Sequence, residues 1–425
     1  MDSVALLAFV LIAVVYSWTV YNIPLLILGV RSYRRDRRER QRSRGEKLNG
    51  KGLPSFSVLI PAKNEEKVLR RLLQSLLSQR YPADKLEVIV VEDGSTDRTV
   101  EVCREFARKS NGVVRLLRAD VSNGKSVALN RGLEAARGDI VAVFDADNIL
   151  ERDVLQMAAK YFEDDLVMAL QGRTLTVNSN VNMLTKFISF EEAAYCEAYL
   201  RGRDALDLFV HLKGTCQFIR REVLEEVGGW RAEYLSDDFE MSARLTAQGH
   251  RVRYAPDVRS WQESPESLVD MFRQRVRWFT GAIEVALSYG RLMRRPSAKT
   301  VDAEVTLLAP FLLILSLLCY IVGPIAFHNL DSSTLLVATL VGWILLTLSI
   351  VSGGMALLYV AQPKKISDLL WVPFIYAYWM FQVVLASWAL IKVVFRVRRE
   401  WTRTPRTGTV ATSNPSSVVS SGESG

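Results

Sequence analysis

The chain of 425 residues has few of the side chains that bind transition metals or form disulfides. It contains four cysteines, Cys103, Cys196, Cys216 and Cys319. Its three histidines are His211, His250 and His328. No C-x-x-C pair occurs and no histidine lies beside a cysteine, so the sequence indicates neither a zinc or iron centre nor a disulfide framework. We expect a reducing, cytosolic location for the main domain.

Most of the chain also lacks a large excess of positive or negative charge. Of the formal net charge of +8, +7 falls in residues 31–51 and +4 in residues 396–406, which leaves −3 for the remainder. The main domain is therefore not expected to bind nucleic acid or another polyanion. Both basic segments flank apolar runs, which favours contact with membrane headgroups. A nucleic-acid-binding tail is the alternative for residues 31–51.

Long hydrophobic runs are abundant, and hydrophobic residues make up 49% of the chain. Four runs, at 4–30, 305–327, 335–360 and 369–395, are each long enough to cross a bilayer. Asp2 precedes the first run and the arginine-rich block follows it, which is unlike a cleaved signal peptide. The sequence thus predicts a multi-pass protein of the cell membrane, with the N-terminus outside and the main domain in the cytoplasm.

This membrane topology contains a conflict. One span before the domain and three after it would leave the arginine-rich tail outside, against the positive-inside rule. Either one run is interfacial or re-entrant, or the charge bias is overridden. The predicted organisation has six parts. They are an N-terminal transmembrane helix (1–30), a basic cytoplasmic linker (31–53), the main domain (54–266), amphipathic interface helices (267–300), three transmembrane segments (301–396) and a basic, then Ser/Thr-rich, disordered tail (397–425).

Between the membrane runs the pattern becomes that of an α/β domain. Short apolar runs at 56–60, 86–91, 113–117 and 140–144 predict buried strands, and amphipathic stretches between them predict helices. Strands that alternate with helices form right-handed βαβ units and a parallel sheet. The polar loops follow the strands, so they should gather at the carboxyl edge of the sheet, where nucleotides bind in such folds.

Asp145 and Asp147 follow the strand 140–144 and flank one small residue. Carboxylates at a strand end suit a hard divalent cation, and such a cation suits a diphosphate. The alternative is an ordinary acidic turn, because Asp and Asn are common turn residues. Taken alone, the pair is a weak signal.

Asp237 and Asp238 precede a helical pattern at 241–247. Adjacent carboxylates raise one another's pKa, which suits a general base. They also suit an ordinary helix N-terminus, where the helix dipole favours negative charge. The local sequence leaves both interpretations open.

Several further residues have both a functional and an ordinary interpretation. Arg277, in the run Gln274-x-x-Arg277-Trp278, could stabilise a leaving diphosphate, although Arg and Trp are also expected at a membrane interface. Lys63 and Lys125 follow strands and could act similarly, or could be solvated surface charges. Asp93 could contact a base or a ribose hydroxyl, with Gly94 allowing close approach of the backbone.

The order of these features resembles the family 2 glycosyltransferases, in particular the membrane-embedded branch with the poly-N-acetylglucosamine, hyaluronan and cellulose synthases. The resemblance covers residues 54–290 and the flanking membrane runs. It rests on Val58-Leu-Ile-Pro-Ala-Lys-Asn-Glu-Glu66, Val90-Val-Glu-Asp-Gly-Ser-Thr-Asp97, Gly124-Lys125, Asp145-Ala-Asp147, Ser236-Asp-Asp238 and Gln274-x-x-Arg-Trp278.

The resemblance implies a GT-A type, Rossmann-like nucleotide-binding domain flanked by transmembrane helices, and a hexosyl- or N-acetylhexosaminyltransferase (EC 2.4). It implies that the nucleotide part of the donor, a UDP-sugar by expectation, is held by Pro61, Ala62, Asn64, Glu65, Asp93, Lys125 and Asp145. Asp147 would bind Mg²⁺ or Mn²⁺, and Asp238 would be the base that deprotonates the acceptor. The diphosphate and the acceptor would meet Gln274, Arg277 and Trp278.

The implied reaction is a single in-line displacement with inversion, and the implied partners are a nucleotide-sugar, a glycan or lipid acceptor and membrane lipids. The leading hypothesis is processive polysaccharide synthesis, and the alternative is transfer of one sugar to a lipid carrier or glycolipid. A catalytically inactive scaffold is a third class of function, but it predicts losses among the acidic motifs, which are intact. Ser236-Asp237 and Glu92 depart modestly from the family pattern, and residues 214–217 depart in a way that concerns the sugar and the acceptor.

Overall fold

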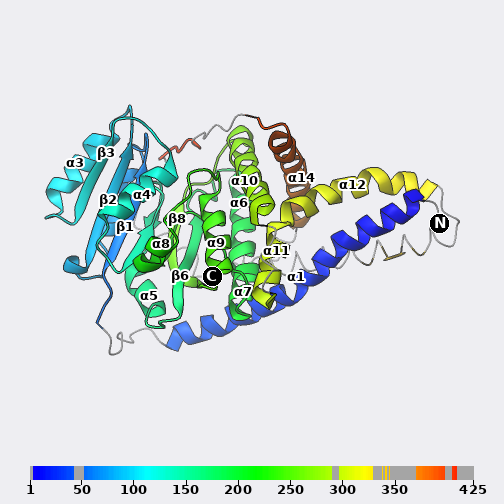
Figure 1. Ribbon diagram of the computed structural model, residues 1–425, viewed down its shortest axis with the longest axis horizontal. Coiled ribbons are helices and arrows are strands. Elements are labelled where there is room, and N and C mark those ends of the chain that lie inside the picture. The colour runs from blue at the N-terminus through cyan, green and yellow to red at the C-terminus, as the bar shows by residue number, and fades with distance from the viewer. Residues whose placement is uncertain are drawn as a thin grey trace.

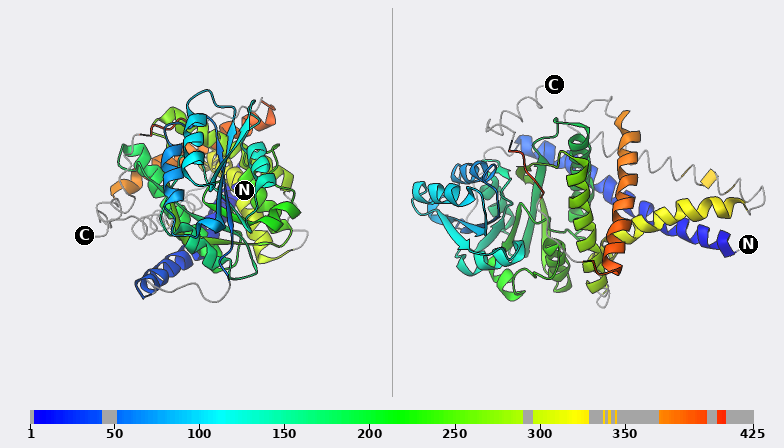
Figure 2. Two further views of the ribbon diagram at one scale, coloured as in Figure 1. Left: turned by 90° about the vertical axis from the view of Figure 1, so that its left-hand side faces the viewer. Right: turned by 90° about the horizontal axis from the view of Figure 1, so that it is seen from above.

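The computed structural model describes residues 3–42, 52–289, 296–328, 370–397 and 404–408, and the single positions 337, 340, 341 and 344. An α/β domain lies at one end, and two long helices leave it side by side as an arm (Figure 1). These are α1 (Ser3–Arg42) and α12 (Ala309–His328). The views from the side and from above show the same division between the sheet and the helical arm (Figure 2).

One sheet of eight strands, in the order β3-β2-β1-β4-β7-β6-β8-β5, organises the domain. The strands are β1 (Phe56–Ala62), β2 (Leu86–Asp93), β3 (Val114–Ala119), β4 (Ile140–Val143), β5 (Ile149–Leu150), β6 (Val167–Thr176), β7 (Gln217–Arg220) and β8 (Arg251–Gln262). β1 pairs in parallel with β2 and β4, and β2 with β3, so the predicted parallel sheet is confirmed for these four strands.

The second half of the sheet differs from the prediction. β7 runs antiparallel to both β4 and β6, and β5 runs antiparallel to β8, so the whole sheet is mixed. Regular alternation of strand and helix ends after β4, and no local pattern beyond it specifies a strand direction. The antiparallel β7 brings the loop before it to the carboxyl end of β4, which is where Asp145 lies.

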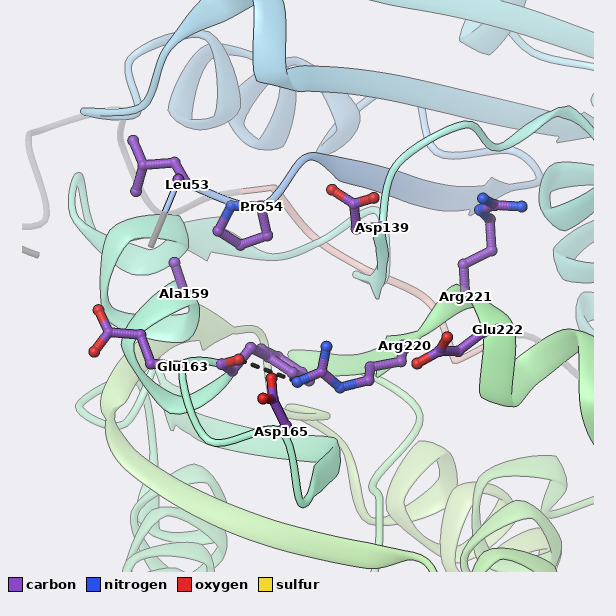
Figure 3. Close-up of a pocket in the computed structure, with 11 residues that line it drawn as sticks. Leu53, Pro54, Asp139, Ala159, Glu163, Asp165, Arg220, Arg221 and Glu222 are labelled. Atoms are coloured by element: carbon purple, nitrogen blue, oxygen red, sulfur yellow. Dashed lines mark hydrogen bonds between the residues drawn. The ribbon is translucent and has the colours of Figure 1, made fainter. Parts of the chain in front are cut away.

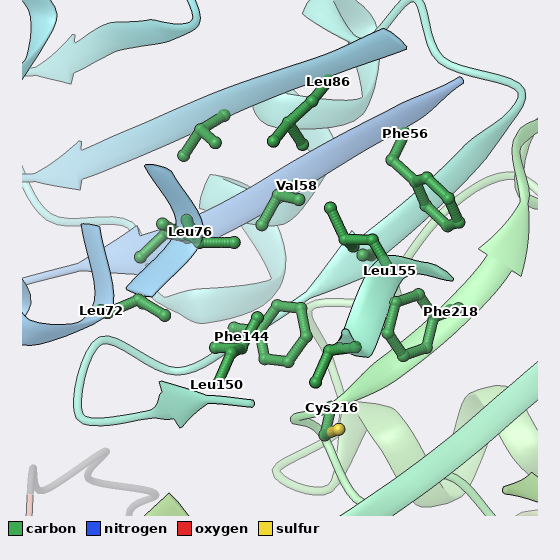
Figure 4. Close-up of a cluster of buried hydrophobic side chains, with 14 of the residues drawn as sticks. Phe56, Val58, Leu72, Leu76, Leu86, Phe144, Leu150, Leu155, Cys216 and Phe218 are labelled. Atoms are coloured by element: carbon green, nitrogen blue, oxygen red, sulfur yellow. The ribbon is translucent and has the colours of Figure 1, made fainter. Parts of the chain in front are cut away.

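Alternating residues of the central strands pack on opposite faces of the sheet. Val58 and Ile60 pack on one face, and Leu59 packs on the other. The first face is covered by α2 (Leu69–Leu77), α3 (Thr99–Lys109) and α5 (Val154–Tyr161), and part of this core is drawn in Figure 4. The second is covered by α4 (Lys125–Ala135), α8 (Arg221–Glu226) and α9 (Asp237–Ala247). Each fully buried Leu, Ile or Phe contributes about 1.5–3 kcal/mol to folding. Because helices cover both faces of the sheet, the carboxyl edge of the sheet is held in place.

Helices after the sheet connect the domain to the apolar segments. α6 (Met183–Ala194) continues through the π-helical turn η2 (Tyr195–Leu200) into α7 (Arg201–Ala205). The predicted amphipathic segment forms α10 (Leu268–Tyr289), which packs on α14 (Val372–Val394). Phe187, Met271 and Tyr378 belong to the apolar cluster that joins α6, α10 and α14. The remaining short element, η1 (Ala83–Lys85), leads into β2.

Among the described residues, two helices are long and apolar enough to cross a membrane, one in α1 and one in α14. A third candidate is α11 (Ala298–Leu307) with α12, which meet at an angle of 52°. The predicted span 305–327 is therefore interrupted. Pro310, at the second position of α12, accounts for the break because it has no N–H to donate to the carbonyl of Thr306 in α11 and its ring would clash with that carbonyl. The predicted span 335–360 lies outside the described residues except at four positions.

The basic residues after the first apolar run continue α1 as far as Arg42, whereas a linker was expected from residue 31. Buried polar contacts hold α1 and α11 against the domain. Asp302 of α11 accepts hydrogen bonds from Tyr21 of α1 and from Arg203 of α7, the latter at 3.1 Å. Removing one partner of such a buried pair costs about 3–5 kcal/mol, so α1, α7 and α11 form one unit with the domain.

Candidate active site

The loops after β1 and β2 bind each other and form one wall of the site. Asn64 adopts φ 57°, which turns the chain sharply after the strand. Its N–H donates to Ser95 Oγ at 2.9 Å, and its Oδ1 accepts from the N–H of Thr96 at 2.8 Å. The N–H of Glu65 donates to Thr99 Oγ1 at 2.7 Å. The predicted nucleotide-side residues of the first loop thus lie in one fixed structure at the carboxyl edge.

Asp93, at the end of β2, holds the turn that begins α4. Its carboxylate accepts hydrogen bonds from Ser122 Oγ at 2.6 Å and from the N–H groups of Asn123 at 2.9 Å and Gly124 at 3.0 Å. The sequence predicts a contact between Asp93 and the nucleotide. In the structure its oxygens already bind this turn, which sets the position of Lys125.

Lys125 joins three loops that are distant in the sequence. Its Nζ donates to Asp145 Oδ1 at 2.7 Å and to the carbonyl of Gly214 at 2.9 Å. Burial disfavours the ammonium, but the negative charges of Asp145 and Asp237 outweigh it and raise the pKa of Lys125. Lys125 is therefore a partly buried cation beside Asp145, so the Gly-Lys pair and the Asp-x-Asp pair meet in the structure.

Asp147 is almost fully covered, with 3% of its surface exposed. Its Oδ2 accepts from the N–H of Glu263 at 3.3 Å and lies 3.1 Å from Nε of Arg406. Burial raises the pKa of Asp147, and the guanidinium of Arg406 opposes that shift. Asp145 is more open, since 34% of its side chain is exposed.

Asp238 lies in the first turn of α9 and faces Lys125 across Gly214. A Cβ added to Gly214 would lie 3.1 Å from Asp238 Oδ2 and 3.3 Å from Lys125 Nζ, so both groups crowd the same backbone atom. Burial, together with the charge of Asp237, raises the pKa of Asp238 to about 6, although Lys125 acts against this shift. Asp237 accepts a hydrogen bond from Ser126 Oγ at 3.0 Å. The two adjacent aspartates have distinct environments.

The predicted Gln274-x-x-Arg277-Trp278 residues lie on α10, which passes close to the start of α9. A Cβ on Gly281 would lie 2.4 Å from Ser236 Oγ, so the glycine permits this approach. Gln274 is buried, and Trp278 is 43% exposed beneath the guanidinium of Arg275 at 4.7 Å. Burial lowers the pKa of Arg277, while Asp145 and Asp238 act to raise it, so Arg277 belongs to the same charged cluster.

Few protein side chains in this cluster could bind a cation. Within the described part of the chain, no three His, Cys, Asp or Glu side chains gather as a metal cage. Asp147 supplies a buried carboxylate, and Asp145 is two residues away. Mg²⁺ and similar ions are commonly held by one or two carboxylates together with substrate phosphates and water. The residues therefore fit a cation that arrives with a diphosphate.

Four residues of this cluster were not predicted from the sequence. Glu263 and Arg406 contact Asp147, Thr215 Oγ1 accepts from the N–H of Asp145 at 3.0 Å, and Ser126 binds Asp237. Thr215 lies in the segment 214–217 that departs from the family pattern, which was the one available signal. Nothing local distinguishes Glu263, Ser126 or Arg406 from other polar residues of the chain.

A hollow at the opposite edge of the sheet does not belong to this cluster (Figure 3). Asp139 lines it just before β4 begins, and Leu53 and Pro54 line it before β1. Arg220, also in the lining, donates to the carbonyls of Val167 at 2.9 Å and Phe162 at 3.0 Å. Its guanidinium is thus engaged in fixing a loop, and the hollow lies at the amino ends of the strands.

Comparison with known proteins agrees with this arrangement. The family profile described as "Glycosyltransferase like family 2" matches residues 54–281, which is more than half of the chain. The protein belongs to the family 2 glycosyltransferases and is an enzyme of the glycosyltransferase class (EC 2.4).

Several curated proteins are similar in sequence. A probable glycosyltransferase, YdaM, of Bacillus subtilis is 33% identical over 286 residues, which is 67% of each chain. A beta-monoglucosyldiacylglycerol synthase of Nostoc is 29% identical over 372 residues, which cover 84% of this chain and 77% of that protein. A poly-beta-1,6-N-acetyl-D-glucosamine synthase of Staphylococcus epidermidis is 28% identical over 233 residues, or 55% of each chain.

Among solved structures, a mannosyltransferase from Pyrobaculum calidifontis, in complex with GDP-Man and Mn²⁺, aligns with a TM-score of 0.61. The alignment covers 93% of this chain and all of that chain at 21% identity. A likeness at this identity shows the fold alone. It confirms the expected GT-A-like α/β fold, in which the sheet of this chain is mixed.

Proposed function

We propose that the protein is a membrane-bound, inverting glycosyltransferase that moves a sugar from a nucleotide-diphosphate sugar to an acceptor hydroxyl. The observation that carries the proposal is the meeting of Asp145, Asp147, Asp238 and Arg277 at one edge of the sheet. Asp145 and Asp147 follow β4, Asp238 lies on α9 and Arg277 lies on α10. Lys125 touches Asp145 and lies within electrostatic reach of Asp238.

Asp238 is the proposed general base. Its raised pKa, about 6, makes it a stronger base than an ordinary carboxylate while leaving most of it ionised at neutral pH. It would take the proton from the acceptor oxygen as that oxygen attacks the anomeric carbon. A single displacement, with no covalent intermediate, inverts the configuration at that carbon.

The leaving diphosphate gains negative charge as the glycosidic bond breaks. Lys125 and Arg277 are partly buried cations of the same charged cluster, and fixed cations stabilise such charge without reorganisation. Asp147, with Asp145, would hold Mg²⁺ or Mn²⁺, and a divalent cation there would neutralise part of the diphosphate charge. The mannosyltransferase of similar fold binds Mn²⁺ together with GDP-Man, which supports this assignment.

For the nucleotide, the wall formed by Pro61, Ala62, Asn64 and Glu65 is the proposed contact surface. Asp93 supports it by fixing the turn before Lys125. A UDP-sugar is the expected donor, and GDP-sugars belong in the same test because the structural neighbour binds GDP-Man. Trp278, which is partly exposed beside this cluster, would meet the acceptor.

Processive polysaccharide synthesis is the first candidate, since a poly-beta-1,6-N-acetyl-D-glucosamine synthase is among the relatives. Transfer of one sugar to a lipid is the second. It is favoured by the extent of similarity to the beta-monoglucosyldiacylglycerol synthase, which covers 84% of this chain against 55% for the polymer synthase. In both cases the acceptor would be presented at the membrane.

Donor screening with the purified full-length protein in lipid vesicles tests this proposal. UDP- and GDP-sugars would be supplied with Mg²⁺ or Mn²⁺, and both the released nucleoside diphosphate and the product size would be measured. Polymer of increasing length supports processive synthesis, whereas release that stops at one sugar per lipid supports the second candidate. No release with any donor, or undiminished release in excess chelator, would count against the donor chemistry or the metal site respectively.

A further inference from the structure

The C-terminal residues 404–408, called the strap here, lie against the catalytic cluster. They form the short red segment beside the sheet in Figure 1, far from the end of α14. The strap has the sequence Thr404-Pro-Arg-Thr-Gly408. Its basic character suggests a membrane contact from sequence alone, but its arginine is directed into the domain.

Arg406 contacts the proposed cation ligand directly. Its Nε lies 3.1 Å from Asp147 Oδ2, and its guanidinium donates to the carbonyl of Glu263. Only 14% of the Arg406 side chain and 3% of the Asp147 side chain remain exposed. The carboxylate is thus covered by a positive charge that belongs to the protein itself.

Glu263 anchors the backbone of the strap. Its Oε2 accepts from the N–H groups of Thr407 at 3.1 Å and Gly408 at 3.3 Å, while its Oε1 lies 2.8 Å from a guanidinium nitrogen of Arg71. Because Glu263 also donates its own N–H to Asp147, one residue fixes both the carboxylate and the segment above it.

The strap ends against the first nucleotide-side loop. Gly408 adopts φ +65°, and a Cβ there would lie 3.0 Å from the carbonyl oxygen of Lys67. A side chain would therefore be strained and crowded at this position. The strap reaches from Asp147 to the loop after β1, so it crosses the region in which the proposed function places the diphosphate.

We propose that the strap is a built-in competitor of the divalent cation, with Arg406 occupying Asp147 until a cation–diphosphate pair displaces it. The proposal rests on the proposed function. A dication and a guanidinium repel strongly at contact distance in a buried site, so the two do not share this carboxylate. A cation alone gains little from displacing Arg406, whereas a cation bound to a diphosphate also brings negative charge for Arg406 to bind. The strap thereby makes metal binding depend on the donor.

Binding of Mn²⁺ to the full-length protein in detergent micelles, followed from the free Mn²⁺ signal in electron paramagnetic resonance, tests this inference. Without nucleotide, Arg406→Gln is expected to bind Mn²⁺ at least 10-fold more tightly than wild type. Gly408→Val unseats the strap but keeps its charge, and it should also increase the affinity for Mn²⁺. Arg406→Lys should stay close to wild type. Arg273→Gln removes an arginine that is 63% exposed on α10 and serves as the matched control without effect.

A second readout follows the strap itself. With Mn²⁺ and UDP or GDP together, cleavage by trypsin after Arg406 should accelerate in wild type, and Mn²⁺ alone should accelerate it much less. Equal Mn²⁺ affinity in wild type and Arg406→Gln, with binding lost in Asp147→Asn, would overturn the competition while leaving the proposed metal site intact. Binding that survives Asp147→Asn would instead overturn the metal site itself.

Discussion

Asp238 and Lys125 share one small space at the carboxyl edge of the sheet, with Gly214 between them. Burial disfavours the charged form of both side chains, and the opposite charge of each stabilises the charged form of the other. Asp237, next to Asp238, adds a like charge and binds Ser126. At the scale of the residue, the site is therefore a set of coupled charges whose balance fixes which carboxylate is available as a base.

The pH dependence of the reaction should reflect this balance. A base acts only when it is ionised, so kcat/KM is expected to rise with pH through a midpoint near 6, the pKa of Asp238, and to level off above it. Asp237→Asn removes the like charge that raises this pKa, so the midpoint should move to lower pH. Measurement of kcat/KM between pH 4.5 and 8.5 checks both statements. An unchanged midpoint in Asp237→Asn would contradict the assignment.

Lys125 should contribute through charge as well as position. Replacing it by methionine keeps the length of the side chain but removes the cation beside Asp145, and we expect a loss of about 100-fold in kcat, typical of one lost charge-stabilising donor. Lys109→Met, at a lysine that is 69% exposed on α3, is the matched control. Steady-state rates of nucleoside diphosphate release measure the effect, and a change below threefold would show that Lys125 has no role in the transition state.

At the scale of elements, the apolar runs predicted β1, β2, β3 and β4 and the helices between them to within a few residues. Buried parallel strands produce such runs directly. The pattern could not predict the directions of β6, β7 and β8, because these depend on long-range pairing. It also missed the break before α12, since an apolar run looks continuous even where Pro310 interrupts the helix.

The candidate site was also predicted only in part, because local motifs are visible in the sequence and long-range contacts are not. The motifs around Asp145, Asp238 and Arg277 are short and were visible in the sequence, and the structure brings them together. The hydrogen bonds of Asp93 and the approach of Arg406 to Asp147 were not visible, because both join segments that only the tertiary fold places in contact.

We expect the position of α10 relative to α9 to depend on the close contact between Gly281 and Ser236. Gly281→Val would place carbon atoms where Ser236 already lies, and overpacking of this kind costs about 1–3 kcal/mol. Because α10 carries Arg277, its displacement should also lower kcat at least 10-fold.

Ala282→Val, at the neighbouring and partly exposed position, is the control for a β-branched residue in this helix. Thermal unfolding in detergent and steady-state kinetics distinguish the two variants. Normal activity and stability in Gly281→Val would mean that α10 does not depend on this close approach.

At the scale of the whole molecule, the strap bears on the membrane topology. Residues 404–408 contact Asp147 and Glu263, so we expect the strap and the catalytic domain to lie on the same side of a membrane. This contact predicts an even number of crossings between the strap and the domain, whereas the sequence predicts three segments after the domain. The bend of 52° between α11 and α12 is consistent with a broken or re-entrant segment, which was one of the two explanations that the charge pattern left open.

Protease protection tests this topology. An epitope tag at the C-terminus should be digested in inside-out vesicles and protected in right-side-out cells, together with an epitope inserted after Gly112, in the turn between α3 and β3. The two tags should respond alike because they share one compartment. Opposite protection of the two tags would contradict the placement of the strap in the site.

One comparison shows whether Asp238 deprotonates the acceptor in a nucleotide-sugar-dependent transfer. Nucleoside diphosphate release by wild type and Asp238→Asn would be measured with the same donor, acceptor membrane and Mn²⁺, alongside donor binding by calorimetry. Loss of a general base lowers turnover by about 100- to 10,000-fold, so we expect a loss in this range with donor affinity within threefold, and no loss in the exposed control Glu233→Gln. Turnover by Asp238→Asn equal to that of wild type would contradict the account.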